Sequence, residues 1–348
     1  MNILLSLLLS GLFSFIFTPI AREIGSKFRI VDHPNHRKIH RTQTPCTGGI
    51  AIYLSFFISL LIVSFIDRNL KPGSSIIGLF IAATLLLIVG IYDDKRDIPP
   101  LKKLYAQIIV SLFAIISGLK IDIITNPFGG TFYLGWLSIP ITLFWFLGFI
   151  NVMNLIDGID GLSGGIACIV SFTLVLVSLF SEGDTTLLSI LSTILAGTTL
   201  TFLRFNFSKR KIFLGDSGSM LLGLLLAGIP IIGYKKAQTL CILIITIVSL
   251  GVPIYDTASS IVRRLKRKVS IFTADKEHIH HKLIESGLSS NQVVLILCGT
   301  SISLGILGIL LTMARNKIVA IIPLAFSLSI IYVRRKGLFS KFKGLRKR

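Results

Sequence analysis

The sequence has little acidic charge and little cysteine. Only 16 Asp and Glu stand against 36 Lys and Arg, and charged residues make up 15% of the 348 positions, less than a soluble domain of this length carries. The 4 cysteines are far apart and form no CxxC pair or other short ligand spacing, which argues against a disulfide framework and a cysteine-ligated zinc. Apolar residues are abundant instead, at 52% with a mean hydropathy of +0.81.

The net charge of +20 would indicate a nucleic-acid partner in a soluble protein. Here apolar runs of nearly transmembrane length recur along the whole chain. Basic residues then serve orientation and attraction to anionic lipid headgroups. We therefore expect a membrane as partner, and no nucleic acid.

The apolar runs predict an all-α polytopic membrane protein with eleven transmembrane helices. They lie at about 3–21, 47–66, 75–92, 103–119, 137–156, 162–180, 185–203, 217–233, 238–256, 291–313 and 317–333. The first run has no basic segment before it, so we interpret it as a span and not as a cleaved signal. Residues 1–333 are expected to form one integral-membrane catalytic domain, and 334–348 a basic cytoplasmic tail.

The basic residues predict the orientation. Of the 36 Lys and Arg, 29 follow the odd-numbered spans and 7 follow the even-numbered ones. Because basic loops stay in the cytoplasm, the amino terminus should lie outside and the carboxyl terminus inside. All 6 histidines and most Asp residues then fall on the cytoplasmic side, so we expect the reactive groups to face the cytoplasm at the membrane boundary.

The stretch "NVMNLIDGIDGLSGG" follows an apolar run and carries a polar side chain at every third position: Asn151, Asn154, Asp157 and Asp160. A three-residue step drifts around a helix of 3.6 residues per turn, so one helix face cannot hold all four. Gly158 and Gly161 indicate that the helix ends near Asp157. Buried amides are costly without partners, so the pattern favours a binding site over a plain loop.

Two further carboxylate motifs stand at helix ends. Asp93 and Asp94 close an apolar helix, where the dipole is already negative and adjacent carboxylates repel. A cation site or a solvated helix end would explain them. Asp216 stands in "GDSGS", where glycines allow close approach and free amides of the next helix favour phosphate, although an N-cap has the same pattern.

The longest polar segment, about 257–290, contains His278, His280 and His281. These histidines could bind zinc or stand beside phosphates, and no cysteine accompanies them. Arg264 belongs to a basic cluster that either only fixes orientation or also contacts phosphate. The first polar segment adds Arg37 and Lys38 as weaker phosphate ligands.

Together and in order, the motifs resemble the polyprenyl-phosphate N-acetylhexosamine-1-phosphate transferases, glycosyltransferase family 4. The resemblance rests on "DHPNHRKIH…TPCTGG", "DDKRDIPPLKKLYAQ", "NVMNLIDGIDGLSGG", "FLGDSGS", "VPIYDT" and "ADKEHIHHKLIESGLS" and spans roughly residues 32–290. The "HIHH" form is similar to the bacterial undecaprenyl-phosphate GlcNAc-1-phosphate transferase branch, which primes O-antigen, enterobacterial common antigen and teichoic acid. "KRKVSIF" departs from that branch, which often has a Pro near Val269, and this leaves the sugar open.

The resemblance implies the transfer of a sugar-1-phosphate from a UDP-N-acetylhexosamine to polyprenyl phosphate, with release of UMP and with Mg²⁺ or Mn²⁺ as cofactor. It implies a multi-pass protein of the bacterial inner membrane with its active site facing the cytoplasm. The lipid chain length and the oligomeric state, including a homodimer, stay open.

The resemblance also implies roles for the site residues. Asp216 would bind the metal with Asn154, and Asp93 and Asp94 would be catalytic, near the lipid phosphate. Asp157, Asp160 and Phe213 would contact the nucleotide. The phosphates or sugar would be held by the remaining predicted residues: His278, His280, His281, Arg37, Lys38 and Arg264.

Two alternatives remain at this point. The same chemistry could use another UDP-N-acetylhexosamine or a muramoyl-pentapeptide donor. An ion-coupled transporter also uses intramembrane carboxylates, but it would place them near mid-span, whereas here they gather toward one face.

Overall fold

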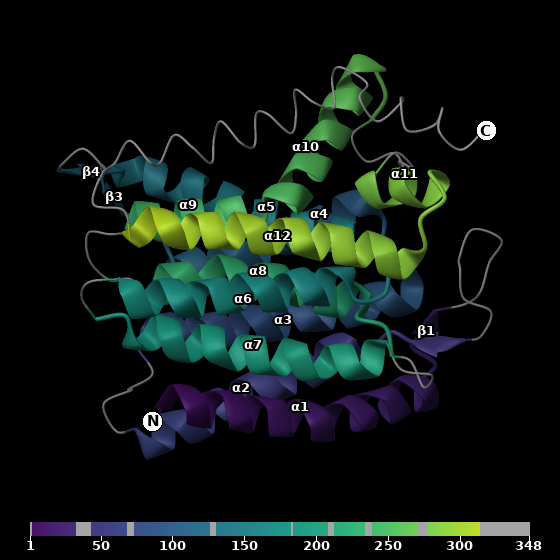
Figure 1. Ribbon diagram of the computed structural model, residues 1–348, viewed down its shortest axis with the longest axis horizontal. Helices are drawn as coiled ribbons and strands as arrows, with labels where there is room; N and C mark the ends of the chain where they lie inside the picture. Colours follow the sequence, from purple (N-terminus) through teal and green to yellow (C-terminus); the bar gives the residue numbers. More distant parts are fainter. Residues whose placement is uncertain are drawn as a thin grey trace, which may run out of the picture.

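The computed structural model describes residues 2–32, 43–67, 73–125, 130–181, 184–207, 212–233, 239–270 and 278–313. Most of them are helical (Figure 1). The helices are α1 Asn2–Lys27, α2 Gly48–Ile66, α3 Ser74–Arg96, α4 Pro100–Ile116, α5 Ser138–Ile156, α6 Leu162–Phe180, α7 Thr186–Asn206, α8 Gly215–Gly233, α9 Thr239–Ser249, α10 Gly251–Lys266, α11 Ile279–Glu285 and α12 Ser290–Met313.

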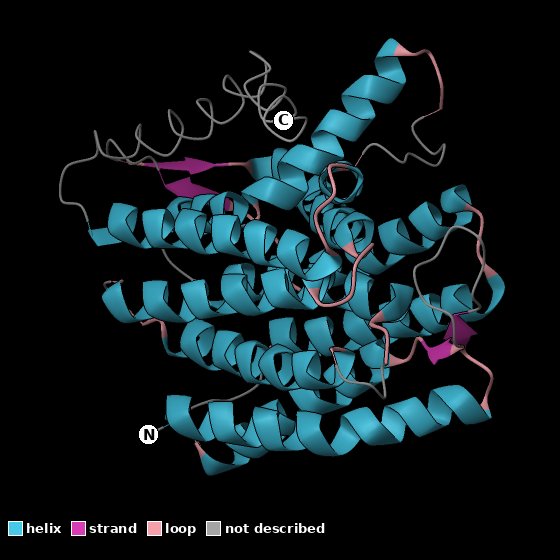
Figure 2. Cartoon of the chain, turned by 45° about the vertical axis from the view of Figure 1, so that its right-hand side comes forward, coloured by secondary structure: helices cyan, strands magenta, loops and turns pink. Residues whose placement is uncertain are grey.

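Two short antiparallel hairpins and one 3₁₀ turn complete the described structure. Strand β1 (Val31–Asp32) pairs with β2 (Thr44–Pro45), with Val31 opposite Pro45. Strand β3 (Ile123–Thr125) pairs with β4 (Thr131–Tyr133), and the 3₁₀ turn η1 (Gly135–Leu137) leads into α5. The hairpins lie at opposite ends of the helical bundle (Figures 1 and 2).

Helix α8 forms the centre of the bundle. Every residue from 217 to 230 is buried, and α8 contacts α3, α5, α2 and α7. A side-chain carbon at Gly90 of α3 would lie 2.3 Å from Ser217 Cα, and one at Gly223 would lie 2.6 Å from Ile150 Cα. Glycine therefore lets the backbones of α3 and α5 pack directly on α8, and this brings three polar helix ends together.

Helix α1 packs on α7 through small side chains. Ser6, Ser10 and Ser14 are buried at four-residue steps, and Ser14 Oγ donates a hydrogen bond to the Thr198 carbonyl across the interface at 2.9 Å. A side-chain carbon at Gly197 would lie 2.2 Å from Ser10 Oγ. Small residues and hydroxyl groups are the usual means of close helix packing in membranes.

The ninth predicted span is broken in the structure. A single helix over 238–256 was expected, but α9 ends at Ser249 and α10 starts at Gly251, with 74° between the two axes. Pro253 has no N–H to donate to the carbonyl one turn back, whereas proline is tolerated in the first turn of a new helix. Helix α10 therefore projects from the bundle (Figures 1 and 2) and carries the basic cluster at its end.

Eight helices among the described residues are long and apolar enough to cross a membrane, and the bent α9–α10 pair would add a ninth. Apolar side chains on the outer surface are widely exposed, such as Phe65, Phe144 and Ile116, as expected of a surface that faces lipid. The chain is therefore a polytopic, mainly α-helical membrane protein. The count of eleven stays a prediction, since span 317–333 lies outside the described residues and α4 is short.

The orientation can be tested with two matched cysteines. Ser181 ends α6 and Ser286 ends α11, and each hydroxyl donates to a helix carbonyl of the preceding turn. Ser181 stands one helix length, about 28 Å, from the start of α6. Helix α11, which Ser286 ends, packs on Gly158 near that start. The two serines therefore lie on opposite faces. In a variant without the four native cysteines, Ser181→Cys should react with a membrane-impermeant maleimide in intact cells, and Ser286→Cys only after permeabilisation. The opposite pattern would invert the orientation.

Candidate active site

Polar residues from four helices meet at one end of the bundle. Asp93 and Asp94 lie in the last turn of α3 and Asn154 in the last turn of α5, while Lys103 and Asp216 lie in the first turns of α4 and α8. A cavity of about 970 Å³ opens beside them. Of the predicted site residues, the cavity is lined by Asp94, Asn154, Asp157, Asp160, Phe213 and Asp216.

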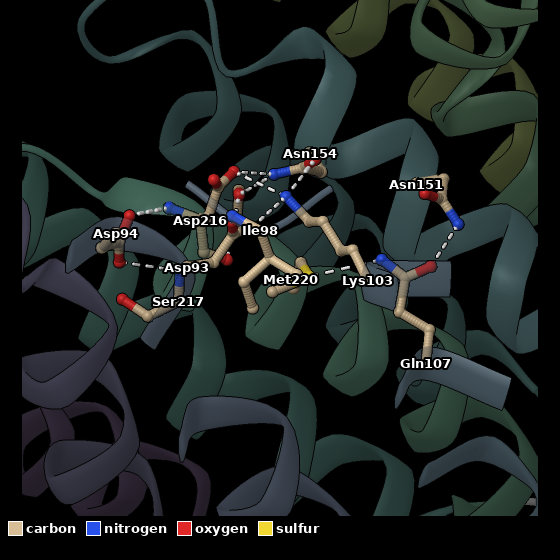
Figure 3. A network of polar contacts seen from close by, with 11 residues as sticks. Asp93, Asp94, Ile98, Lys103, Gln107, Asn151, Asn154, Asp216, Ser217 and Met220 are labelled. Atoms are coloured by element: carbon tan, nitrogen blue, oxygen red, sulfur yellow. Dashed lines mark hydrogen bonds and ion pairs between the residues drawn. The ribbon is translucent and has the colours of Figure 1, made fainter. Parts of the chain in front are cut away.

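Lys103 is the centre of this polar cluster (Figure 3). Its Nζ atom lies 2.8 Å from Asp93 Oδ2 and 3.0 Å from Asp216 Oδ1, and it donates a hydrogen bond to Asn154 Oδ1 at 3.1 Å. One ammonium group therefore joins residues that are more than 100 positions apart. Lys103 was not among the residues predicted from the sequence, although the pattern "PLKKLYAQ" places a lysine at the start of an apolar helix, which is itself a functional signal.

Asn154 uses both ends of its carboxamide. Its Oδ1 accepts from Lys103, and its Nδ2 donates to Asp216 Oδ1 and, at 2.9 Å, to Ser219 Oγ. The amide thus orients the Asp216 carboxylate from the side of α5. Its assignment as a metal ligand stays a prediction.

Asp94 caps helix α8. Its Oδ1 accepts the amide of Asp216 at 2.6 Å and its Oδ2 accepts the amide of Ser217 at 3.1 Å. A helix start offers unpaired N–H groups and partial positive charge, and here a carboxylate from α3 takes two of them. The sequence left open whether these amides are free for phosphate or capped, and the structure shows that the amides of Asp216 and Ser217 are capped by Asp94. Gly215, with φ of 73°, makes room, since a side-chain carbon there would lie 2.7 Å from Asp94 Oδ2.

Asp93 has a different set of partners. It is 4% exposed, its Oδ1 accepts the Ile98 amide at 2.7 Å, and its Oδ2 pairs with Lys103. The bond to Ile98 ties the loop after α3 back to the helix end. The two adjacent carboxylates thus have different partners: Asp94 holds the amides of α8, and Asp93 holds Lys103 of α4 and the Ile98 amide.

A second polar row runs deeper between α4 and α5. Asn151 Nδ2 donates to Gln107 Oε1 at 2.8 Å, and Gln107 Nε2 contacts Met220 Sδ at 3.3 Å. The amides therefore satisfy each other inside the membrane domain. As predicted, α5 ends at Ile156, with Asn151 and Asn154 in its last turns and Asp160 in the turn beyond.

The loop after α5 forms one wall of the cavity. Burial raises the pKa of the Asp157 carboxyl well above its usual range, and the negative charges of Asp216 and Asp94 raise it further. Gly161 has φ of 79° and lies against the ring of Phe207, which leaves no space for a side-chain carbon. Phe207 and Phe213 both line the cavity and offer apolar faces near the carboxylates.

The three histidines lie behind this loop and differ from one another. A side-chain carbon at Gly158 would lie 2.5 Å from His280 Nε2, so His280 packs directly on the cavity wall. His278 is buried and paired with Asp256, whereas His281 is exposed. Arg264 lies at the end of α10. Arg37 and Lys38 lie outside the described residues.

The donor atoms of the cluster suit a hard divalent cation. Mg²⁺ prefers carboxylate and carbonyl oxygens, and the point between Asp93, Asp216 and Asn154 already holds a cation, the ammonium of Lys103. Among the residues that the structure describes, no three His, Cys, Asp or Glu side chains converge as a complete metal site. Asp216 is the best placed, because its carboxylate lines the cavity and its side chain is 38% exposed.

Comparisons with known proteins match these features. The model of a family described as "Glycosyl transferase family 4" matches residues 76–234. The chain is 35% identical over 297 residues to a probable undecaprenyl-phosphate N-acetylglucosaminyl 1-phosphate transferase of Bacillus subtilis, covering 85% of this chain and 81% of that protein.

Two further relatives have related names. A decaprenyl-phosphate N-acetylglucosaminephosphotransferase of Mycobacterium tuberculosis is 32% identical over 313 residues, covering 83% of this chain and 78% of the relative. An undecaprenyl-phosphate alpha-N-acetylglucosaminyl 1-phosphate transferase of Escherichia coli K12 is 30% identical over 307 residues, covering 86% and 81%.

Lys103→Met should destabilise the fold, because it removes the cation that holds Asp93 and Asp216 together and leaves the buried carboxylate of Asp93 facing that of Asp216 without a counter-charge. We expect the free energy of unfolding to fall by about 3 kcal/mol, measured by reversible unfolding in mixed micelles. The neighbouring Lys102 is exposed, so Lys102→Met is the matched control and should change it by less than about 0.5 kcal/mol. Equal effects of the two substitutions would contradict the central role of Lys103.

Proposed function

Because the chain belongs to glycosyl transferase family 4, we propose that it transfers N-acetylglucosamine-1-phosphate from a UDP-sugar to polyprenyl phosphate. The products would be UMP and a lipid diphosphate sugar. The observation that carries the proposal is the Lys103-centred cluster of carboxylates beside a cavity at one end of a membrane bundle. A lipid substrate requires a site at the membrane edge, and a nucleotide sugar requires one that opens to water.

The reaction we propose is a single displacement at phosphorus. An oxygen of the lipid phosphate attacks the β-phosphorus of the UDP-sugar, the bond to the bridging oxygen breaks, and UMP leaves with that oxygen. One diphosphate linkage replaces another, so no ATP is needed. Phosphoryl transfer depends mainly on positioning and on neutralising charge.

The partners of Asp93 and Asp94 support this route over a phosphosugar–enzyme intermediate. Both oxygens of Asp94 accept backbone amides of α8, and Asp93 is held by Lys103 and Ile98. A carboxylate in such contacts is a poor nucleophile, because attack would break the contacts that order the site. We assign Asp94 to holding α8 and Asp216 in place. We assign Asp93 two roles: it holds Lys103 near the lipid phosphate, and it accepts the proton of that phosphate.

We assign the metal to Asp216, with Asn154 orienting or sharing the ion. When bound, Mg²⁺ or Mn²⁺ would neutralise the diphosphate and stabilise the leaving UMP. The protein holds the Asp216 carboxylate at the cavity wall, because the Lys103 ammonium pairs with its Oδ1 atom and Asn154 Nδ2 donates a hydrogen bond to the same atom.

The remaining assignments follow the cavity wall. Asp157, Asp160 and Phe213 would contact the nucleotide, Phe213 through its ring. The histidines behind Gly158, His278, His280 and His281, would hold the diphosphate or the sugar. Arg264, Arg37 and Lys38 would be further basic groups for the phosphates. The site would face the cytoplasm of a bacterial inner membrane, where the nucleotide sugar is.

The donor can be identified directly. The purified protein, incubated with undecaprenyl phosphate, Mg²⁺ and UDP-N-acetylglucosamine, should release UMP and form a lipid diphosphate sugar resolved by thin-layer chromatography. Parallel reactions with UDP-N-acetylgalactosamine and UDP-muramoyl-pentapeptide should be slower. A faster reaction with either of these would reassign the donor, and no UMP from any of the three would reject the proposed reaction.

Asp216→Asn should keep the fold, because an amide oxygen can still accept from Lys103 and Asn154, yet lose the charge that attracts a divalent cation. We expect Mn²⁺ binding, followed by electron paramagnetic resonance, to weaken, and the transfer rate to fall by about 10². Asp184→Asn is the control, since this exposed aspartate stands at the start of α7 on the far face. Unchanged Mn²⁺ binding in Asp216→Asn would remove Asp216 from the metal site.

A further inference from the structure

Asp256 is a buried carboxylate that no step of the proposed reaction uses. It lies on α10 within "VPIYDT", is 4% exposed and does not line the cavity. Its Oδ2 lies 2.9 Å from His278 Nδ1, and its Oδ1 accepts the Ile279 amide at 2.8 Å. Both oxygens therefore hold the start of α11, which joins two elements that the chain separates by a polar segment.

The contact sets the tautomer of His278. An ionised carboxylate can only accept hydrogen bonds, so the proton must be on Nδ1 of the imidazole. The other ring nitrogen, Nε2, makes no hydrogen bond with any residue that the structure describes. A histidine whose Nδ1 is fixed by a carboxylate presents Nε2 in one orientation, as in many carboxylate–histidine pairs.

His278 in turn supports His280. The two rings are parallel within 3° at a centroid distance of 5.7 Å, and His280 lies on Gly158, a residue of the cavity wall. A continuous column thus runs from Asp256 through His278 and His280 to Gly158. Without Asp256, the His278 ring and the Ile279 amide would lose the carboxylate that holds them.

The column distinguishes histidines that the sequence presented as equivalent. Burial lowers the pKa of His280 to about 4, and the neighbouring histidines add to this. His280 is therefore neutral at physiological pH and acts as a packing element between His278 and Gly158. His278 is the histidine that has a carboxylate partner, and His281 stands at the surface.

We propose that Asp256 is a positioning residue of the transferase, which fixes the Nδ1–H tautomer of His278 and holds the histidine column against Gly158. The proposal rests on the proposed function, since the column is taken to serve the diphosphate of the donor. Asp256 acts through His278 and touches no substrate itself. If His278 and His280 shift relative to Gly158, binding of the UDP-sugar should be impaired more than the chemical step.

Asp256→Asn tests whether Asp256 positions the His278 ring or only supports the start of α11. If its amide oxygen keeps the bond to the Ile279 amide, its Nδ2 must donate to His278 Nδ1, and the ring proton moves to Nε2. We expect the KM for the UDP-sugar to rise about 10-fold with little change in kcat or thermal stability. Asp122→Asn is the control, because Asp122 accepts the Ser138 hydroxyl at 2.9 Å at the opposite end of the bundle.

A double-mutant cycle completes the test. Asp256→Asn in a His278→Ala background should cost nothing further, because the two residues act through one contact. In enzyme labelled with ¹⁵N-histidine, the His278 signals should show the Nδ1–H form in the wild type and the Nε2–H form in Asp256→Asn. Additive losses, an unchanged KM in either single variant, or an unchanged tautomer would overturn the inference.

The same experiment keeps the two proposals apart. Should the wild type transfer no sugar phosphate at all, the proposed function fails, while the ¹⁵N spectra still decide whether Asp256 sets the tautomer. Should transfer proceed normally in both variants, the function stands and the positioning role is rejected.

Discussion

The Lys103 ammonium is the interaction on which the described site depends. Three carboxylate and carboxamide groups from α3, α5 and α8 converge on it, and without a cation they would repel or stay unsatisfied in a largely buried setting. A single positive charge makes it favourable for three helix ends to come together. The same oxygen-rich surroundings have the donor chemistry that a divalent cation prefers, which is the basis of the metal assignment proposed above.

Helix α8 fixes the relative positions of the helices that carry these groups. Two amides of its first turn are capped by Asp94 of α3. Gly90 of α3 and Gly223 of α8 bring the backbones of α3 and α5 into direct contact with α8. The position of Asp216 at the cavity is thus set by a charge–dipole contact and by close packing. The gathering of carboxylates at one end, and not at mid-span, is the arrangement expected of an enzyme that joins a lipid to a water-soluble donor, and differs from that of an ion-coupled transporter.

The break between α9 and α10 brings residues from the last third of the chain to the end of the bundle where the cavity lies. It directs α10 away from the bundle and places Asp256 where it can hold α11, so that the histidines lie behind Gly158. The cavity therefore has two differently built walls. One contains Asp216 and Asn154, which Lys103 holds from behind, and the other is a glycine-rich loop supported by a stack of imidazoles.

The sequence alone determined the membrane class, the ends of most helices and which polar motifs stand at the helix ends, because apolar length and the positions of Asn, Asp, Gly and His are local properties. Asn154, Asp157, Asp160 and Asp216 were singled out on that basis, and all four line the cavity. The partners of Asp94, the central position of Lys103, the 74° break and the Asp256–His278 contact were decided only by tertiary structure. Each depends on two helix ends, far apart in the chain, meeting at distances that packing around α8 sets.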